Sequence, residues 1–168
     1  MIPRLLVAAE LLLFAASGSF LTACGSVVLD QRIEAKANDW AFTVKSVRDG
    51  PNSYVSTRGP GPAERWVPPG HHRFLIFTVS LRNDARARRS FHYEDCDLDD
   101  PGHDKVFLPV IVDRNVLVNL PILDKSDDVD SGESVSRMLY YAYPEDRYPT
   151  RLDCGGKLVL PLPFEGGR

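Results

Sequence analysis

Residues 73–83 read Arg-Phe-Leu-Ile-Phe-Thr-Val-Ser-Leu-Arg-Asn, and this stretch decides the fold class. Every second position from 75 onward is apolar, and these positions are Leu75, Phe77, Val79 and Leu81. A period of two places such side chains on one face of an extended strand. The β-branched and aromatic residues in the stretch suit a half-buried pleated surface. We therefore predict a long β-strand whose apolar face lies in a core.

Three further segments show the same period and predict strands. They are residues 40–45, 133–144 and 158–162. Turn residues separate the strands, namely Asn38-Asp39 and the hairpin sequence 99–102. No segment after the first 23 residues has a convincing helical period. The pattern predicts an all-β fold, a β-sandwich of two antiparallel sheets.

Three stretches are expected to interrupt the regular strands. Residues 50–70 are rich in proline and glycine, which favours a long surface loop. Pro109 lies within the apolar run 106–118, which favours edge strands or a bulge over a central strand. Residues 124–132 are acidic and are expected to form a loop.

The N-terminus has the order of a secretory signal, with Arg4 before an apolar segment, residues 5–23, that ends in small side chains. It resembles the bacterial lipoprotein signal, whose lipobox would be Leu-Thr-Ala at 21–23 followed by Cys24. The resemblance implies cleavage before Cys24 and acylation of that cysteine, for example with palmitate. Several acyl chains hold a soluble domain durably at a membrane surface.

This reading divides the chain into a signal peptide at 1–23, a lipidated tether or first strand at 24–37, and a sandwich at 38–168. The protein would face the extracytoplasmic side of the cell membrane. An uncleaved anchor helix, or an ordinary secretory signal with a chance cysteine at position 24, would also export the domain.

The full chain has 168 residues and a formal net charge of −3. Basic residues are scattered except for the cluster Arg86, Arg88 and Arg89, so the sequence lacks the footprint of a nucleic-acid-binding protein. That cluster is a candidate contact for anionic headgroups near the anchor, and a solvated turn is the alternative.

Cys96 and Cys154 remain as a pair in a domain expected to meet an oxidising compartment. We predict a disulfide between them, which would stabilise the fold by about 4 kcal/mol in the chain-entropy model. Two unpaired buried thiols, or part of a metal site, are the alternatives.

Four sequence segments, each a predicted strand with its turn, resemble the small exported immunoglobulin-like, or telokin-like, bacterial domains of unknown function. They are residues 40–47, 70–83, 98–102 and 131–144. The resemblance implies an immunoglobulin-like sandwich behind the lipoprotein signal. Because these segments are structural patterns without a chemical signature, they imply a fold and leave the function open.

The candidates for chemistry are few. Asp95, Asp97 and Asp99 have the opening spacing of a calcium loop, but position 100 lacks the required glycine and position 106 lacks the bidentate glutamate. They stay weak metal candidates beside the reading as a solvated hairpin. His71 and His72 are adjacent, so a strand would point them to opposite faces. We expect no metal site, cofactor or catalytic group.

Exposed tyrosine and tryptophan favour recognition surfaces. Alternation places Tyr141 and Tyr143 inside, which leaves Trp66, Tyr140 and Tyr148 as candidate contact residues. We expect a non-enzymatic module, anchored to the membrane by lipid, that binds an envelope protein or a ligand. A metal-binding or metal-dependent hydrolytic protein and a purely structural envelope component are the alternatives.

Overall fold

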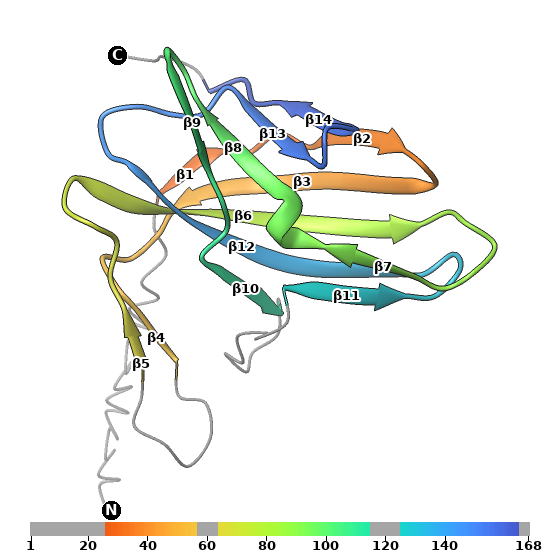
Figure 1. Ribbon diagram of the computed structural model, residues 1–168. Coiled ribbons are helices and arrows are strands. Elements are labelled where there is room, and N and C mark those ends of the chain that lie inside the picture. The colour runs from red at the N-terminus through yellow and green to blue at the C-terminus, as the bar shows by residue number, and fades with distance from the viewer. Residues whose placement is uncertain (1–25, 57–63, 115–124, 165–168) are drawn as a thin grey trace, which may run out of the picture.

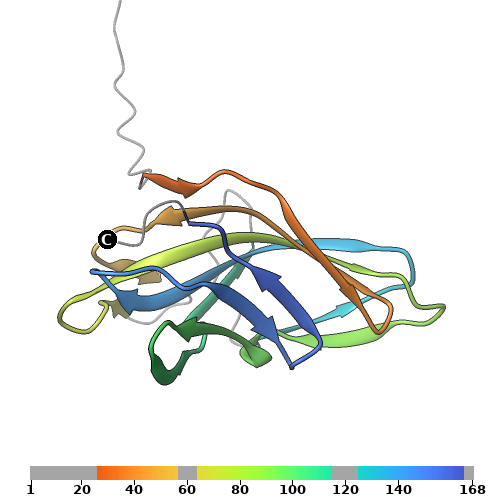
Figure 2. The same ribbon diagram turned by 90° about the horizontal axis from the view of Figure 1, so that it is seen from above.

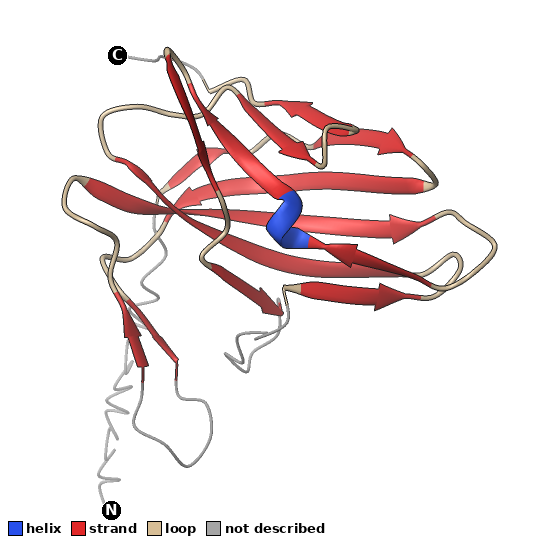
Figure 3. Ribbon diagram, in the orientation of Figure 1, coloured by secondary structure: helices blue, strands red, loops and turns tan. Residues whose placement is uncertain are grey.

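The computed structural model describes residues 26–56, 64–114 and 125–164. Strands dominate these ranges, and one short helical turn, η1, spans Tyr93–Asp95 (Figure 3). All strand pairs are antiparallel. The prediction of an all-β fold built from antiparallel sheets is confirmed.

The larger layer is a six-stranded sheet in which β6, the strand predicted from residues 73–83, is central. Its strands are β1 (Val27–Leu29), β2 (Ile33–Ala37), β3 (Trp40–Asp49), β6 (His72–Asn83), β12 (Ser134–Pro144) and β10 (Ile111–Arg114). The order is β1-β3-β6-β12-β10, and β2 also pairs with β3 (Figure 1). Residues 27–37, which the sequence left as a tether or a first strand, therefore contain two edge strands.

The second layer is built from shorter strands. One sheet has the order β14-β13-β8-β9, and β11 pairs with β7 in a separate ribbon. These strands are β14 (Leu158–Pro161), β13 (Arg151–Cys154), β8 (Cys96–Asp100), β9 (His103–Phe107), β11 (Ser126–Val129) and β7 (Arg89–His92). Figure 2, seen from above, shows the two layers.

The main core lies between the layers and uses the side chains that alternation predicted. Leu75, Phe77, Val79 and Leu81 are completely buried, as are Leu139, Tyr141 and Tyr143 on β12. Leu98, Leu152 and Leu160 of the second layer belong to the same cluster. Which face of these strands is buried was therefore predictable from the sequence. A shift of one residue would have turned every apolar side chain of the strand toward solvent.

Two predicted turns have the expected local geometry. Asn38 and Asp39 have φ of 51° and 62° and connect β2 to β3 as a two-residue hairpin loop. Two positive φ values define the type I′ turn that matches strand twist. Pro101 and Gly102 likewise connect β8 to β9, with Gly102 at φ 81°.

Two expected loops contain strands. Within residues 50–70, β4 (Tyr54–Ser56) pairs with β5 (Glu64–Trp66), because neither triplet contains a proline or glycine. The acidic stretch contains β11, in which Val129 is buried and Asp127 forms an ion pair with Arg137. Pro109 falls between β9 and β10, which are both edge strands as predicted.

Candidate functional site

A groove with a volume of about 440 Å³ opens at the end of the sandwich where β6 begins and β12 ends. Its principal lining residues are His71, His72, Asp100, Lys105, Phe107 and Arg147. The turn before β6, the end of β8, strand β9 and the loop after β12 each contribute to the wall. We refer to this feature as the end groove.

Asp100 forms the buried acidic part of the end groove. Its side chain is 1% exposed, and it accepts hydrogen bonds from Nε of Arg147 at 2.6 Å and from Nη2 at 2.9 Å. This two-pronged geometry is the strongest form of arginine–carboxylate contact. Hydrogen bonding to the Arg147 guanidinium lowers the pKa of Asp100. The pair therefore keeps opposite charges inside the groove over the neutral pH range.

His71 lies at the rim in an unusual backbone conformation, with φ of 62°. The N–H of His72 donates to the carbonyl of Pro69 at 3.0 Å, which closes a turn with His71 at its third position. A turn with positive φ there normally has glycine or asparagine. His71 is exposed, and its imidazole belongs to the groove lining. Strained residues of this kind concentrate at binding sites.

His72 presents a hydrogen-bond acceptor next to an aromatic wall. Its Nδ1 lies 2.9 Å from the carbonyl oxygen of Gly70, which can only accept, so Nδ1 carries the proton. In the neutral ring Nε2 is then an acceptor. The His72 ring lies 6.2 Å from that of Phe107, which in turn lies 4.8 Å from Tyr143. The site thus combines an imidazole acceptor, an exposed ammonium at Lys105 and an apolar surface.

The candidate contact residue Tyr140 is buried, and its prediction as a surface residue was wrong. It is 6% exposed, and its ring lies 5.1 Å from Tyr54 and 6.1 Å from Phe74. Strand β4 covers this part of the outer face of the large sheet, forming a second small apolar cluster. Burial beside the Asp113 carboxylate raises the pKa of Tyr140 to about 12.

The other two candidate contact residues differ in exposure. Trp66 is 44% exposed on β5. Tyr148 is half-buried, with its ring stacked 4.8 Å from Phe164 and the Arg73 guanidinium 4.4 Å from the Tyr148 centroid. Of the three, Trp66 is the most exposed.

The three aspartates considered for calcium do not converge. Asp95 is in η1, whereas Asp97 and Asp99 lie on one face of β8. Asp99 accepts backbone N–H bonds from Thr150 at 2.7 Å and Arg151 at 2.9 Å, so it organises the approach to β13. Burial, followed by the Asp153 charge, raises the pKa of Asp97. In the described part of the chain, no group of three or more His, Cys, Asp and Glu residues is placed to hold a metal ion.

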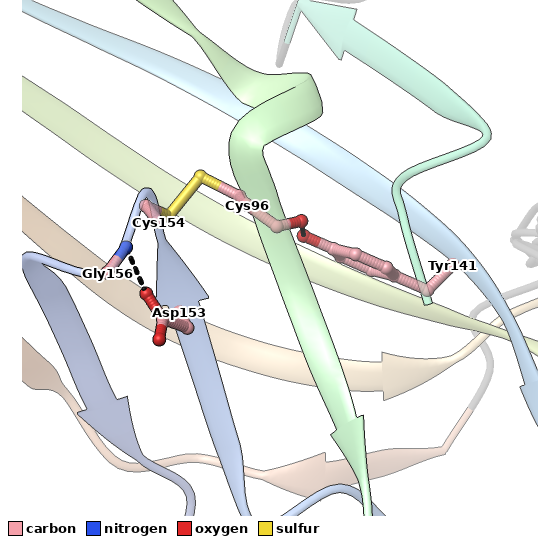
Figure 4. Close-up of a disulfide and its surroundings, with 5 residues drawn as sticks. All are labelled: Cys96, Tyr141, Asp153, Cys154 and Gly156. Atoms are coloured by element: carbon pink, nitrogen blue, oxygen red, sulfur yellow. Dashed lines mark hydrogen bonds between the residues drawn. A yellow bond between two sulfur atoms is a disulfide. The ribbon is translucent and has the colours of Figure 1, made fainter. Parts of the chain in front are cut away.

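Cys96 and Cys154 form a disulfide between directly opposed residues of β8 and β13, with their Cα atoms 3.9 Å apart (Figure 4). The Tyr141 hydroxyl donates to the Cys96 carbonyl at 3.0 Å and ties the bridge to the large sheet. On the other side the N–H of Gly156 donates to Asp153 at 2.7 Å. Both cysteines are buried, and neither of them lines the end groove.

The basic cluster is at the other end of β6 from the end groove. It follows Asn83, the last residue of β6, whereas His72 is the first. Arg88 pairs with Asp128 at 3.1 Å, and Arg89 donates to the Asn38 carbonyl at 2.6 Å. These bonds hold Arg88 and Arg89 to the fold, which favours the interpretation of the cluster as a turn.

Sequence reasoning treated the end-groove residues singly and did not bring them together. The sequence predicts His71 and His72 on opposite faces of a strand, position 100 fails the calcium-loop pattern, and Arg147 belongs to no predicted site. The Asp-Pro-Gly turn at 100–102 was the one local signal near the site. Nothing in the spacing reveals that Arg147 reaches across to Asp100.

Cys24 lies outside the described residues. Within the ranges that are described, no helix is long and apolar enough to cross a membrane. No protein-family model matches the chain, and no curated protein or solved structure does so either.

Proposed function

We propose that this chain is a lipid-anchored binding module of the cell envelope, tethered at Cys24, which receives its ligand in the end groove. The observation that carries the proposal is the end groove, whose lining combines Lys105, His72 and Phe107. Its position relative to the tether follows from the bond between Asp49 and Ser26, in which the N–H of Asp49 donates to the Ser26 carbonyl at 3.0 Å. This hydrogen bond holds Ser26 beside the end of β3. The chain therefore enters the domain at the end where the groove opens.

Arg73 connects that entry point to the groove. Its Nε lies 2.9 Å from Oδ1 of Asp49, and its Nη2 donates to the Arg147 carbonyl at 3.0 Å. Its Nη1 donates to the carbonyl of Glu145. One side chain thus links the end of β3 to the loop that forms a wall of the groove. A ligand in the groove would lie close to the tethered end of the domain.

The chemistry of the end groove suits recognition of a ligand with both polar and apolar parts. Lys105 and the two imidazoles offer donors and acceptors, while Phe107 offers an apolar surface. Among the groove-lining residues, Asp100 has a buried carboxylate, and its charge is already matched by Arg147. Open grooves with a few placed polar groups on an apolar wall are typical of binding sites. This mixture supports a binding role over a catalytic one.

Intact mass spectrometry of protein extracted from membranes, beside a Cys24→Ala variant, tests the anchor. We expect a mass that begins at Cys24 plus acyl chains, and we expect the variant to lose the acyl mass. An unacylated wild-type protein would contradict the proposal. Metal content measured on the same sample would favour the metal-dependent alternative if it were stoichiometric.

Photo-crosslinking in envelope preparations tests the groove. A photoreactive amino acid replaces Lys105, and the control replaces Val159, which is 45% exposed on β14 and does not line the groove. We expect a discrete adduct from position 105 that is absent from position 159. Equal labelling, or none, from the two positions would argue against the groove as the binding site.

A further inference from the structure

The hairpin formed by β4 and β5 exposes apolar side chains. Val55 is 45% exposed, Trp66 is 44% exposed, and Val67, just after β5, is 61% exposed. Figure 1 shows this hairpin standing away from the two layers. The ribbon has only three residue pairs, 54 with 66, 55 with 65 and 56 with 64. Because two-stranded ribbons are marginally stable in water, exposed apolar groups on this one suggest that another medium covers them.

The base of the hairpin is fixed to the domain. Tyr54 is 6% exposed, packs against Tyr140 and Phe74, and donates a hydrogen bond to Asp113 at 3.1 Å. At the start of the segment the N–H of Gly50 donates to the Phe74 carbonyl at 2.7 Å. A Cβ at position 50 would lie 2.7 Å from the Cβ of Phe74, so glycine is needed for this path. Because paired residues of neighbouring strands share a face, Trp66 lies on the same face of the ribbon as the fixed Tyr54, and Val55 lies on the opposite face with Arg65.

The hairpin leaves the domain beside the tether. The hairpin segment follows Asp49, whose backbone N–H is hydrogen-bonded to the carbonyl of Ser26. Val27, the residue after Ser26, is another exposed apolar side chain, with 48% exposure. Cys24 is two residues before Ser26, and two extended residues span at most about 7 Å. An acyl anchor on Cys24 would thus hold the base of the hairpin close to the membrane surface.

We propose that hairpin β4–β5 docks on the lipid surface, with the Trp66 side chain at the headgroup level. The inference rests on the proposed lipid anchor. Tryptophan favours the membrane–water interface, and arginine favours anionic headgroups. Arg65, which is exposed on β5, offers a cation to such headgroups. A small apolar surface is enough for membrane contact when the domain is already anchored, because the docking step is then intramolecular.

The same contact would orient the end groove. The groove and the hairpin both lie at the end of the sheet where β3 ends and β6 begins. A domain held by two points, the acyl chains and the hairpin, would keep the groove in one orientation relative to the membrane. A domain on a single tether would sample many orientations.

Tryptophan quenching in vesicles tests the docking. The acylated mature protein, whose mass is verified to begin at Cys24, is reconstituted in phosphatidylethanolamine–phosphatidylglycerol vesicles whose acyl chains carry bromine. The chain has two tryptophans, and Trp40 is 7% exposed in the core. We expect bromine to remove most of the Trp66 emission, obtained as the difference between wild type and Trp66→Phe. The emission of Trp66→Phe, which comes from Trp40, should not change.

Two matched aspartate variants provide the control. Val67→Asp should reduce the quenching of Trp66, whereas Val159→Asp, at a similarly exposed apolar position on β14, should leave it unchanged. Acylated protein whose Trp66 is not quenched would overturn the docking and leave the anchor intact, and a protein partner would then be the occupant of the hairpin. A mass without acyl chains would overturn both the anchor and the docking.

Discussion

The carboxylate of Asp100 and the guanidinium of Arg147 are joined by two hydrogen bonds, of 2.6 and 2.9 Å, across the end groove. Asp100 ends β8 in the second layer, and Arg147 follows β12 of the large sheet. The pair therefore connects the two layers at the proposed binding end. His103 also lies 3.4 Å from Asp100, on the outer side.

Replacing Arg147 with methionine should lower stability most at neutral pH. Because the Arg147 bond depresses the pKa of Asp100 below 3.8, the folded state binds this proton more weakly than the unfolded state. The stabilisation is thus present above the unfolded value and lost as pH falls through the folded value. Urea unfolding should show a lower midpoint for Arg147→Met at pH 7 and a shrinking difference from wild type below pH 3.8.

The exposed Arg48 provides the control for that series. Arg48→Met should leave the midpoint close to that of wild type throughout. A difference between Arg147→Met and wild type that stayed constant across the acid range would contradict an electrostatic role for the pair.

Replacing Asn83 with aspartate should lower the free energy of unfolding by about 2–4 kcal/mol, since two buried hydrogen bonds are lost. Asn83 is fully buried, and its amide nitrogen donates to the carbonyls of Ala87 and Val129, both at 2.8 Å. A carboxylate cannot donate and would face both carbonyl oxygens. Asn52→Asp, at an exposed position, should change stability little in the same urea titration. Equal effects at the two sites would rule out the proposed role of the Asn83 amide.

Replacing His71 with glycine should stabilise the domain by about 0.5–1 kcal/mol. The left-handed conformation costs a residue with a Cβ roughly 1–2 kcal/mol, and glycine avoids this cost. Part of the gain is lost because glycine gives the unfolded chain more conformational entropy. Asp39→Gly is the matched control, since Asp39 has the same φ of 62° in the hairpin between β2 and β3. Thermal unfolding should show both gains. Crosslinking from position 105 should weaken in His71→Gly alone if the imidazole contacts the ligand.

Removing the disulfide should cost about 4 kcal/mol on the chain-entropy model. The cysteines are 58 residues apart in sequence. In a full-length Cys24→Ala background, the denatured protein should show no free thiol before reduction and two afterwards. A Cys96→Ala, Cys154→Ala double variant should unfold at a lower urea concentration. Two thiols in the unreduced sample would disprove the bridge.

Alternation predicted the buried face of β6 and β12 correctly, but it assigned Tyr140 to solvent. The error arose because alternation along a strand shows which side chains share a face of the sheet, but it does not show whether another segment covers that face. Here Tyr54, from a segment expected to be a loop, lies over Tyr140. The same limit applies to β11, where Asp127 is directed inward because Arg137 of the large sheet supplies the opposite charge.

The sequence by itself determined the strand faces, the turns at 38–39 and 101–102, the edge strands on either side of Pro109 and the all-β class. These features depend on side-chain period and on the φ preferences of individual residues, which are local. Only the tertiary structure decided that Asp100, Arg147 and His71 share a groove, and that hairpin β4–β5 leaves the domain beside Ser26. Such juxtapositions depend on which strands pair and how the layers pack, and these non-local choices have no signature in residue spacing.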